Sequence, residues 1–219
     1  MRHHCPLCKT HAATANVFHI DKRREYYRCE TCYLVFVPER FHLSHSEEKS
    51  IYDLHQNSPQ DAGYRRFLSR LFQPLQQRLN TLAQGLDFGC GPGPTLSVMF
   101  EEQGYRIDHY DPYYANNPNM LERRYDFITC TEVVEHFRDP ASSWSLLSNL
   151  LGSHAWLGIM TKLVINQEAF SRWHYIQDPT HICFYSKQTL NWIAAQYNYQ
   201  IEFIEADVVL FQKKDNTSL

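Results

Sequence analysis

The segment LDFGCGPG, residues 86–93, decides how the rest of the sequence is interpreted. Its first three residues are typical of a short buried strand, and Gly89, Gly91 and Gly93 follow at every second position. Glycines let the backbone turn tightly and approach a ligand closely. A helix expected over about residues 94–103 starts directly behind them, so its free N–H groups are available to a carboxylate. The segment therefore predicts a strand, a ligand-binding turn and a helix.

Strand-like and helix-like segments alternate after this turn. We expect strands over residues 105–110, 125–131 and 155–163, and helices over 141–151 and from the cap at Ser186 to about 197. Two last strands, over 199–204 and 208–213, are expected to close the sheet as an antiparallel pair. Upstream, residues 61–83 carry apolar residues at helical spacing around Pro74. This alternation predicts an α/β fold, a parallel sheet with helices on both faces.

An acidic residue, Asp111, lies 18 residues after Gly93 at the end of the next expected strand. A carboxylate at this point can accept hydrogen bonds from ribose hydroxyls. A dinucleotide site would need the spacing G-x-G-x-x-G, whereas the glycines here follow G-x-G-x-G and Pro94 comes next. The spacing argues against a pyrophosphate site, and an ordinary strand–helix turn remains the alternative to a cofactor site.

The glycine turn resembles motif I of class I S-adenosylmethionine-dependent methyltransferases, an acidic residue followed by x-G-x-G-x-G. The resemblance implies that S-adenosylmethionine is the cofactor, that the turn contacts its methionine part and that Asp111 holds its ribose. Residues 125–140 and 178–186 resemble the family's fourth-strand motif and the acceptor-side loop of small-molecule members, so the likeness covers about residues 61–213. The implied cofactor-binding residues are Asp87, Gly89, Cys90, Gly91, Gly93, Asp111, Thr131 and Glu132.

The sequence departs from this family after Asp111. Tyr125 follows Asp111 by 14 residues, where the family places a helix, a further strand and a residue that recognises adenine. We therefore expect an abbreviated Rossmann-like sheet whose third strand is reduced or missing. Thr131 or the tyrosines of the short loop are the candidates for adenine recognition.

Glu132, Glu135 and His136 form the pattern E-x-x-E-H, which would share one face of a helical turn. Two carboxylates and an imidazole suit Mg²⁺, Mn²⁺ or Zn²⁺, so a second divalent metal at these residues is one hypothesis. The pattern resembles the O-methyltransferases of ubiquinone biosynthesis and the small-RNA terminal 2′-O-methyltransferases, whose further histidine would correspond to His181 or His174. The alternative is the arrangement of metal-free relatives, in which the Glu–His pair shapes the cofactor pocket.

His181 is the candidate general base, with Glu135 and His136 as the other predicted catalytic residues. An imidazole has an ordinary pKa of about 6.5, which suits proton removal near neutral pH. The alternative is a structural histidine that holds an aromatic loop in place.

Four cysteines near the start form two C-x2-C pairs, Cys5 with Cys8 and Cys29 with Cys32. Four thiolates satisfy a structural tetrahedral Zn²⁺, and redox dithiols are the alternative. The module resembles zinc ribbons, which also occur fused to sugar C-methyltransferases and to ribosomal RNA methyltransferases, where they hold the acceptor or build a wall of the site. A purely structural role is equally compatible with the residues. We expect a zinc-ribbon-like module over 1–38, a polar linker over 39–60 and the methyltransferase domain over 61–219.

Composition limits the remaining choices. The 219 residues carry a net charge of −3, which argues against a generally basic nucleic-acid binder, although basic runs such as 22–24 keep an RNA surface as an alternative. There is no apolar run of the ~20 residues that a membrane helix needs, and no signal-peptide core, so we expect a cytoplasmic protein. The predicted activity is O- or C-methylation of a small molecule. RNA methylation, and a non-catalytic binding protein whose zinc module docks a partner, are the alternatives.

Overall fold

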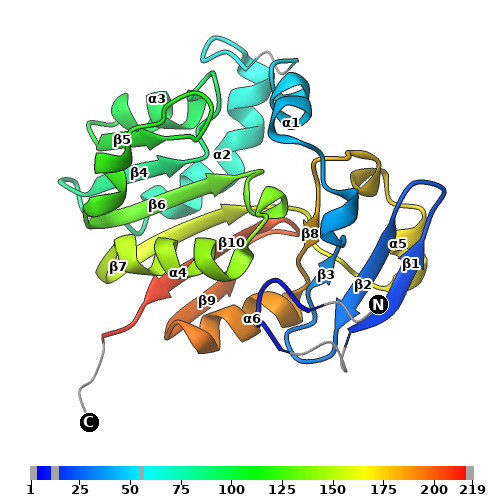
Figure 1. Cartoon of the computed structure of the whole chain (residues 1–219). Helices are drawn as coiled ribbons and strands as arrows, with labels where there is room; N and C mark the ends of the chain where they lie inside the picture. The colour runs from blue at the N-terminus through cyan, green and yellow to red at the C-terminus, as the bar shows by residue number, and fades with distance from the viewer. Residues whose placement is uncertain (1–3, 11–14, 55–56, 216–219) are drawn as a thin grey trace.

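Two sheets form the frame of the molecule in the computed structural model, which describes residues 4–10, 15–54 and 57–215 (Figure 1). The large sheet has the strand order β5-β4-β6-β7-β10-β9. Its strands are β4 (Gln84–Phe88), β5 (Arg106–Tyr110), β6 (Tyr125–Thr131), β7 (Leu151–Met160), β9 (Tyr199–Phe203) and β10 (Val208–Lys213). Neighbouring strands from β5 to β7 are parallel, whereas β10 runs antiparallel to both β7 and β9. The predicted α/β class and the closing antiparallel pair are confirmed.

Alternate residues of the strands face two separate cores. Phe127 and Leu210 pack with the helices α2 (Ala62–Gln76) and α3 (Thr95–Glu101), so these helices cover one face of the sheet. Ile128 and Phe211 belong to the core beneath α4 (Pro140–Leu150) and α6 (Lys187–Gln196) on the other face. Because side chains along a strand alternate between faces, the two faces of the sheet contribute apolar residues to two separate cores.

The shortened interval after Asp111 contains no sheet strand in the described chain. Residues 112–124 form a loop that ends in a short 3-10 helix, Pro118–Glu122, and β5 is the edge of the large sheet. Asp111 itself makes one isolated bridge, to Ala115. The predicted loss of the third strand is therefore confirmed.

Two element boundaries differ from those expected. Helix α2 ends at Gln76, two residues after Pro74, rather than continuing to residue 83. Beyond its end Ala83 is still buried in the core, whereas Leu82 is 93% exposed. Pro74 lies inside the helix, where its ring cannot donate the usual backbone hydrogen bond. Strand β7 starts at Leu151 directly behind α4, without the turn that would have marked the change in the sequence.

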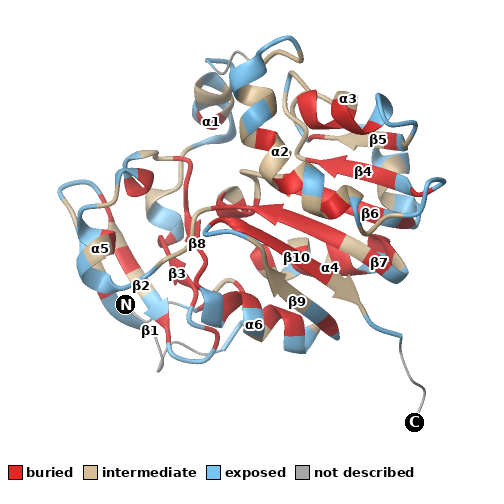
Figure 2. Cartoon of the chain, turned by 180° about the vertical axis from the view of Figure 1, so that it is seen from behind, coloured by how far each residue is buried: buried red, intermediate tan, exposed pale blue. Residues whose placement is uncertain are grey.

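The small sheet has the order β1-β2-β3-β8, and its last strand comes from the other end of the chain. Its strands are β1 (Ala15–Ile20), β2 (Glu25–Cys29), β3 (Val35–Phe36) and β8 (Cys183–Phe184). In β3 and β8, Val35 pairs with Phe184 and Phe36 with Cys183, all of them buried (Figure 2). The cysteine module is thus joined by backbone hydrogen bonds to a segment almost 150 residues further along the chain.

The segment 39–60 contains helix α1 (His45–Tyr52), which begins at a capping box between Ser44 and Glu47. A second short helix, α5 (Gln167–Ser171), packs beside β1. No helix in the described ranges has the length and apolar character that a membrane span requires.

Candidate active site

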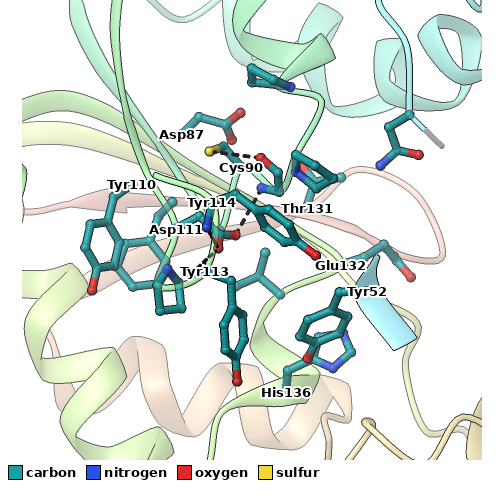
Figure 3. Close-up of a pocket in the computed structure, with 18 of the residues that line it drawn as sticks. Tyr52, Asp87, Cys90, Tyr110, Asp111, Tyr113, Tyr114, Thr131, Glu132 and His136 are labelled. Carbon is teal, nitrogen blue, oxygen red and sulfur yellow. Dashed lines mark hydrogen bonds between the residues drawn. The ribbon is translucent and has the colours of Figure 1, made fainter. Parts of the chain in front are cut away.

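A cavity of about 880 Å³ opens beside the carboxyl ends of β4, β5 and β6. This edge of a parallel sheet is where α/β proteins bind their ligands. Every residue predicted to bind the cofactor lines the cavity, as do His136 and His181. Figure 3 labels several of these residues, among them Asp87, Asp111 and His136. Glu135 lies behind this wall and is fully buried.

The glycine turn has the backbone that its sequence predicts. Gly89 and Gly91 have φ values of +76° and +63°, a region that side chains with a Cβ disfavour. A Cβ on Gly89 would clash with Val133, and one on Gly93 with the backbone oxygen of Asn57, whereas a Cβ on Gly91 would meet open space. The turn is therefore packed closely at Gly89 and Gly93 and open toward the cavity at Gly91.

Asp111 joins this turn to the tyrosine loop. Its Oδ2 accepts a hydrogen bond of 3.0 Å from the backbone N–H of Gly91, and its Oδ1 accepts from the N–H groups of Tyr113 and Tyr114 at 2.8 and 3.1 Å. The side chain is 7% exposed. Figure 3 shows it between the glycine turn and the tyrosines, at the side of the cavity. Asp111 thus fixes the shape of both loops at the end of β5.

Asp87 lies beneath the turn. Its two carboxylate oxygens accept hydrogen bonds from the hydroxyls of Ser97 (2.9 Å) and Thr129 (2.8 Å), which come from α3 and β6. Burial raises the pKa of this carboxyl. Asp87 therefore ties the turn to the neighbouring helix and strand.

Two polar atoms at the end of β6 have no partner within the described chain. They are Thr131 Oγ1 and Glu132 Oε1, both buried on residues that line the cavity. Buried polar atoms are nearly always hydrogen-bonded in folded proteins, so such atoms mark a place where a ligand is expected. Burial and the nearby Glu135 raise the pKa of Glu132 to about 8. A polar ligand group at this end of β6 would satisfy both atoms.

Glu135, His136 and His181 meet on the opposite side of the cavity. One ligand atom from each lies within 4.8 Å of the other two. The Nδ1 atoms of His136 and His181 contact the backbone oxygens of Thr180 (3.1 Å) and Tyr175 (2.8 Å). Because a carbonyl only accepts, both Nδ1 atoms carry the hydrogen, and each Nε2 carries a lone pair whenever its ring is uncharged.

Glu132 is not part of this cluster, although the sequence pattern places it with Glu135 and His136. Glu132 has a φ of +53°, and residues Val134–His136 form a 3-10 turn rather than an α-helix. The three side chains therefore do not share one helical face. His181, from a distant loop, takes the third place in the cluster.

Two of the three residues of the cluster, Glu135 and His181, are buried, and His136 is partly buried. Glu135 accepts hydrogen bonds from Thr161 Oγ1 (3.0 Å) and from the hydroxyl of Tyr175, and burial raises its pKa. His181 is 8% exposed, and burial, followed by the neighbouring His136, lowers its pKa. At neutral pH the His181 ring is therefore uncharged, with a basic lone pair on Nε2.

Helix α1 contributes a wall of the cavity that the sequence did not predict. The carboxylate of Glu48, 6% exposed, accepts hydrogen bonds from Tyr52 (3.0 Å), Tyr113 (2.9 Å) and Arg138 (3.0 Å). The ring of Tyr52 meets His136 edge to face at 5.4 Å, as Figure 3 shows. The available signal was the capping box at Ser44, which marks a helix start inside a polar stretch.

The four cysteines of the N-terminal module converge as well. The Sγ atoms of Cys5 and Cys32 are 3.4 Å apart, those of Cys8 and Cys29 are 3.5 Å apart, and all four lie within 4.8 Å of one another. None forms a disulfide. Tetrahedral Zn²⁺ with bonds of about 2.3 Å places its sulfurs at comparable separations. The donor set therefore fits zinc.

Comparison with known proteins agrees with this geometry. A family model described as a methyltransferase domain matches residues 60–202, more than half of the chain. The chain belongs to this methyltransferase family. A ubiquinone biosynthesis O-methyltransferase of Yersinia pestis is 28% identical to this chain over 80 residues. The match covers 36% of the chain and 33% of the relative, so the chain spans about a third of that protein's length.

Two solved structures share the fold of this chain. One is a 1,6-didemethyltoxoflavin-N1-methyltransferase of Burkholderia thailandensis with bound 1,6-didemethyltoxoflavin and S-adenosylhomocysteine. It has a TM-score of 0.53 and 14% identity, over 92% of this chain and 100% of its own. The other is an O-methyltransferase family protein of Burkholderia thailandensis. It has a TM-score of 0.51 and 12% identity, and the match covers 78% of this chain and 64% of that protein. These likenesses show the class I methyltransferase fold.

Proposed function

We propose that this protein transfers a methyl group from S-adenosylmethionine to an oxygen or carbon of a small-molecule acceptor. The observation that carries the proposal is that two groups of residues line one cavity. On one side is the open glycine turn, in which the Gly91 N–H donates to Asp111, and on the other side are His136 and His181. A cofactor site and a basic side chain are the two parts that methyl transfer to a hydroxyl or an acidic carbon requires.

The cofactor roles follow from the contacts described above. The turn at residues 89–93 would take the methionine end, and Asp111 the ribose hydroxyls. Thr131 and Glu132 would give their unpartnered atoms to polar groups of the same ligand. When bound, the cofactor supplies a methyl group on a positively charged sulfur that is its own leaving group. The abbreviated loop leaves Tyr113 and Tyr114 beside Asp111 as the groups nearest to an adenine ring.

The residues of the chain would act by orientation and proton removal. His181 Nε2 would accept the proton of the acceptor as the new bond to the methyl carbon forms and the carbon–sulfur bond breaks. Its Nδ1–H bond to the Tyr175 carbonyl keeps the lone pair on Nε2. Tyr52 and His136 would align the acceptor and limit water access.

A divalent metal at Glu135, His136 and His181 is the second candidate role for this cluster. Its support is that both histidines donate Nδ1–H to carbonyls and present Nε2, as metal-bound histidines do. The two roles exclude each other at His181, because one lone pair cannot both accept a proton and bind a metal. Calorimetric titration of the zinc-loaded protein with Mn²⁺ separates the two roles. Binding heat in the parent protein that disappears in His181→Ala favours the metal site. No binding heat in the parent protein favours the general base.

A small-molecule acceptor is supported by the size of the cavity and by the ubiquinone biosynthesis O-methyltransferase named above. RNA is the alternative, and its marker is affinity that falls steeply with salt concentration. We further propose that Cys5, Cys8, Cys29 and Cys32 bind a structural Zn²⁺.

Titration calorimetry with S-adenosylmethionine and S-adenosylhomocysteine tests the cofactor assignment. We expect micromolar binding that weakens at least a hundredfold, about 2.7 kcal/mol, in Asp111→Ala. Asp126→Ala is the matched control, because this exposed carboxylate bonds the Gln84 N–H away from the cavity. A folded, zinc-loaded protein that binds neither molecule would refute the proposal and favour the non-catalytic alternative.

A further inference from the structure

The loop that carries His181 is held by its backbone carbonyls. Each of the seven carbonyl oxygens from Tyr175 to His181 accepts a hydrogen bond from a side chain. Those of Tyr175 and Thr180 accept from His181 and His136. The other five, on Ile176, Gln177, Asp178, Pro179 and His181, accept from two adjacent arginines of the cysteine module.

Arg24 makes most of these contacts. Its Nη1 donates to the carbonyls of Pro179 (3.0 Å) and His181 (2.9 Å), and its Nη2 to those of Ile176 (2.6 Å) and Asp178 (2.9 Å). Its Nε donates to the Tyr26 hydroxyl at 3.2 Å. All five N–H donors of a guanidinium lie on Nε and the two Nη atoms, so the whole fork of Arg24 is engaged. Arg23 is exposed. It donates hydrogen bonds to the carbonyls of Gln177 (3.0 Å) and Ile176 (3.4 Å) only.

This guanidinium is 5% exposed and has no carboxylate within ion-pair distance among the described residues. A buried cation is costly unless dipoles or charges surround it. The loop carbonyls supply those dipoles, and Tyr26 passes a hydrogen bond on to Asp21 at 2.9 Å. Arg24 and the loop therefore depend on each other for their conformations.

Backbone hydrogen bonds from the residue after β3 also link the cysteine module to Ile182 and Glu135, next to His181. Val37 N–H donates to the Ile182 carbonyl, and Ile182 N–H donates to the Glu135 carbonyl, both at 2.9 Å. His181 thus lies between the Arg24 contacts on one side and a backbone path from β3 to Glu135 on the other.

We infer that Arg24 is a positioning residue for the transfer site. Its guanidinium sets the conformation of residues 175–182 and thereby the direction in which His181 presents Nε2 to the acceptor. The inference rests on the proposed function and deepens it, because it makes the cysteine module a part of the acceptor site. An error of about 1 Å in such alignment is enough to slow transfer about a hundredfold.

The test compares Arg24→Gln and Arg24→Lys with Arg28→Gln in the intact chain. Arg28 lies in the same module, with its guanidinium 5.2 Å from the ring of Phe18, and has no contact with the loop. Hydrogen exchange at the amides of Thr180, His181 and Ile182 reports the loop. Long-range ¹⁵N spectra of the His181 ring at one fixed pH report whether Nδ1 still carries the hydrogen. Zinc content and S-adenosylhomocysteine affinity are measured on every variant.

We expect Arg24→Gln to speed exchange at these amides more than tenfold and to mix the two ring tautomers of His181. Arg24→Lys should show a smaller effect of the same kind, because an ammonium keeps the charge but lacks the planar fork. Arg28→Gln should match the parent protein. Cofactor-product affinity should change less than twofold throughout, because Arg24 does not line the cavity.

Parent-like exchange and a parent-like His181 ring in zinc-loaded Arg24→Gln would overturn the inference. A lower unfolding temperature with an unchanged ring spectrum would also overturn it, since that is the signature of a purely structural arginine. Should Arg24→Gln lose its zinc, Arg24→Lys decides by the same two readouts. Failure of the parent protein to bind S-adenosylhomocysteine would refute the cofactor proposal, while the exchange and ring data would still decide the role of Arg24.

Discussion

Gly91 and Gly93 lie two residues apart in the cofactor turn, yet a methyl group would meet different surroundings at each. At Gly91 it would enter open space in the cavity from a left-handed backbone, φ +63°. At Gly93 it would press on the backbone of Asn57. Glycine is therefore required at position 91 to keep space for a ligand, and at position 93 to let the backbone of Asn57 pack closely.

This difference predicts different defects for two alanine variants. Gly91→Ala should lower the free energy of unfolding by only about 1–2 kcal/mol, the cost of a left-handed alanine, but weaken S-adenosylhomocysteine binding at least tenfold. Gly93→Ala should displace the segment around residue 57 and speed hydrogen exchange in α1. Calorimetry and exchange measurements on the two variants check this, and identical profiles would contradict the assignment of the open side of the turn.

Glu132 predicts a pH dependence of stability. Its pKa is about 8 in the folded protein against an ordinary value of 4.5, chiefly because of burial. The folded state therefore holds a proton that the unfolded state releases between these values. The free energy of unfolding should fall as pH rises from about 4.5 to 8, by at most about 1.4 kcal/mol per pH unit from this group. Denaturant unfolding of the ligand-free protein at several pH values should show a flatter profile in Glu132→Gln; parallel profiles would contradict the raised pKa.

The spacing of residues in the sequence predicted the site residues only where the residues that act together are close in the chain. The glycines and Asp111 fit this case, because a strand–turn–helix unit and the end of the adjacent strand fix them. The partnership of His136 with His181 does not, since 45 residues separate them and the loop between them is irregular. The sequence offered His181 as a candidate among twelve histidines, but it could not show the carbonyls that set its tautomer.

At the scale of elements, α1 is attached to the protein mainly through Glu48. Burial alone would raise the pKa of this carboxyl, but hydrogen bonds from Arg138, Tyr113 and Tyr52 outweigh it and lower the pKa below its ordinary 4.5. This contribution is present above pH 4.5 and is lost as the pH falls through the lowered value.

Glu48→Gln should therefore loosen α1 at neutral pH. A hydrogen bond to a charged group contributes about 1.5–3 kcal/mol, so exchange of the α1 amides should accelerate roughly tenfold to a hundredfold. Lys49→Gln is the control, because it removes an exposed ion pair with Asp53, the residue after the helix, and an exposed contact with the ring of Tyr114, and leaves Glu48 in place. Exchange that is equal in the two variants would show that other contacts hold α1.

The central strands β6 and β10 were predictable because most of their residues are buried apolar ones. Helix α1 was not predictable, because its only buried residue is charged. A helix whose docking is ionic leaves no apolar stripe in the sequence. The overestimated length of α2 has the opposite origin, since apolar residues such as Leu82 continue the helical spacing into solvent.

At the scale of the molecule, removal of zinc should affect the acceptor side first. The four cysteines hold the module whose strand β3 pairs with β8, whereas the cofactor turn belongs to the large sheet. Chelation should lower the unfolding midpoint by about 10 °C or more and expose residues 175–184 to exchange. S-adenosylhomocysteine should still bind, and Zn²⁺ added back should restore both properties. Loss of cofactor-product binding together with zinc would contradict this separation.

The sequence predicted the parallel strands of the large sheet, its closing antiparallel pair and its reduced or missing third strand. The missing strand was predictable because a 14-residue interval is too short for a helix and a strand. The joining of the two sheets could not. The pairs between β3 and β8 connect residues 35–36 with 183–184 through two-residue strands, which carry no periodic signal.

The strand β8 has a practical consequence for engineering. A chimera that replaced residues 1–60 with another metal ribbon would leave Cys183 and Phe184 without a backbone partner and the loop before them without its guanidinium. The donor ribbon would need both a free strand edge in the register of β3 and an arginine at the tip of its first hairpin. Natural recombination near residue 60 faces the same two requirements. Residues 1–60 and the rest of the chain should therefore be inherited together.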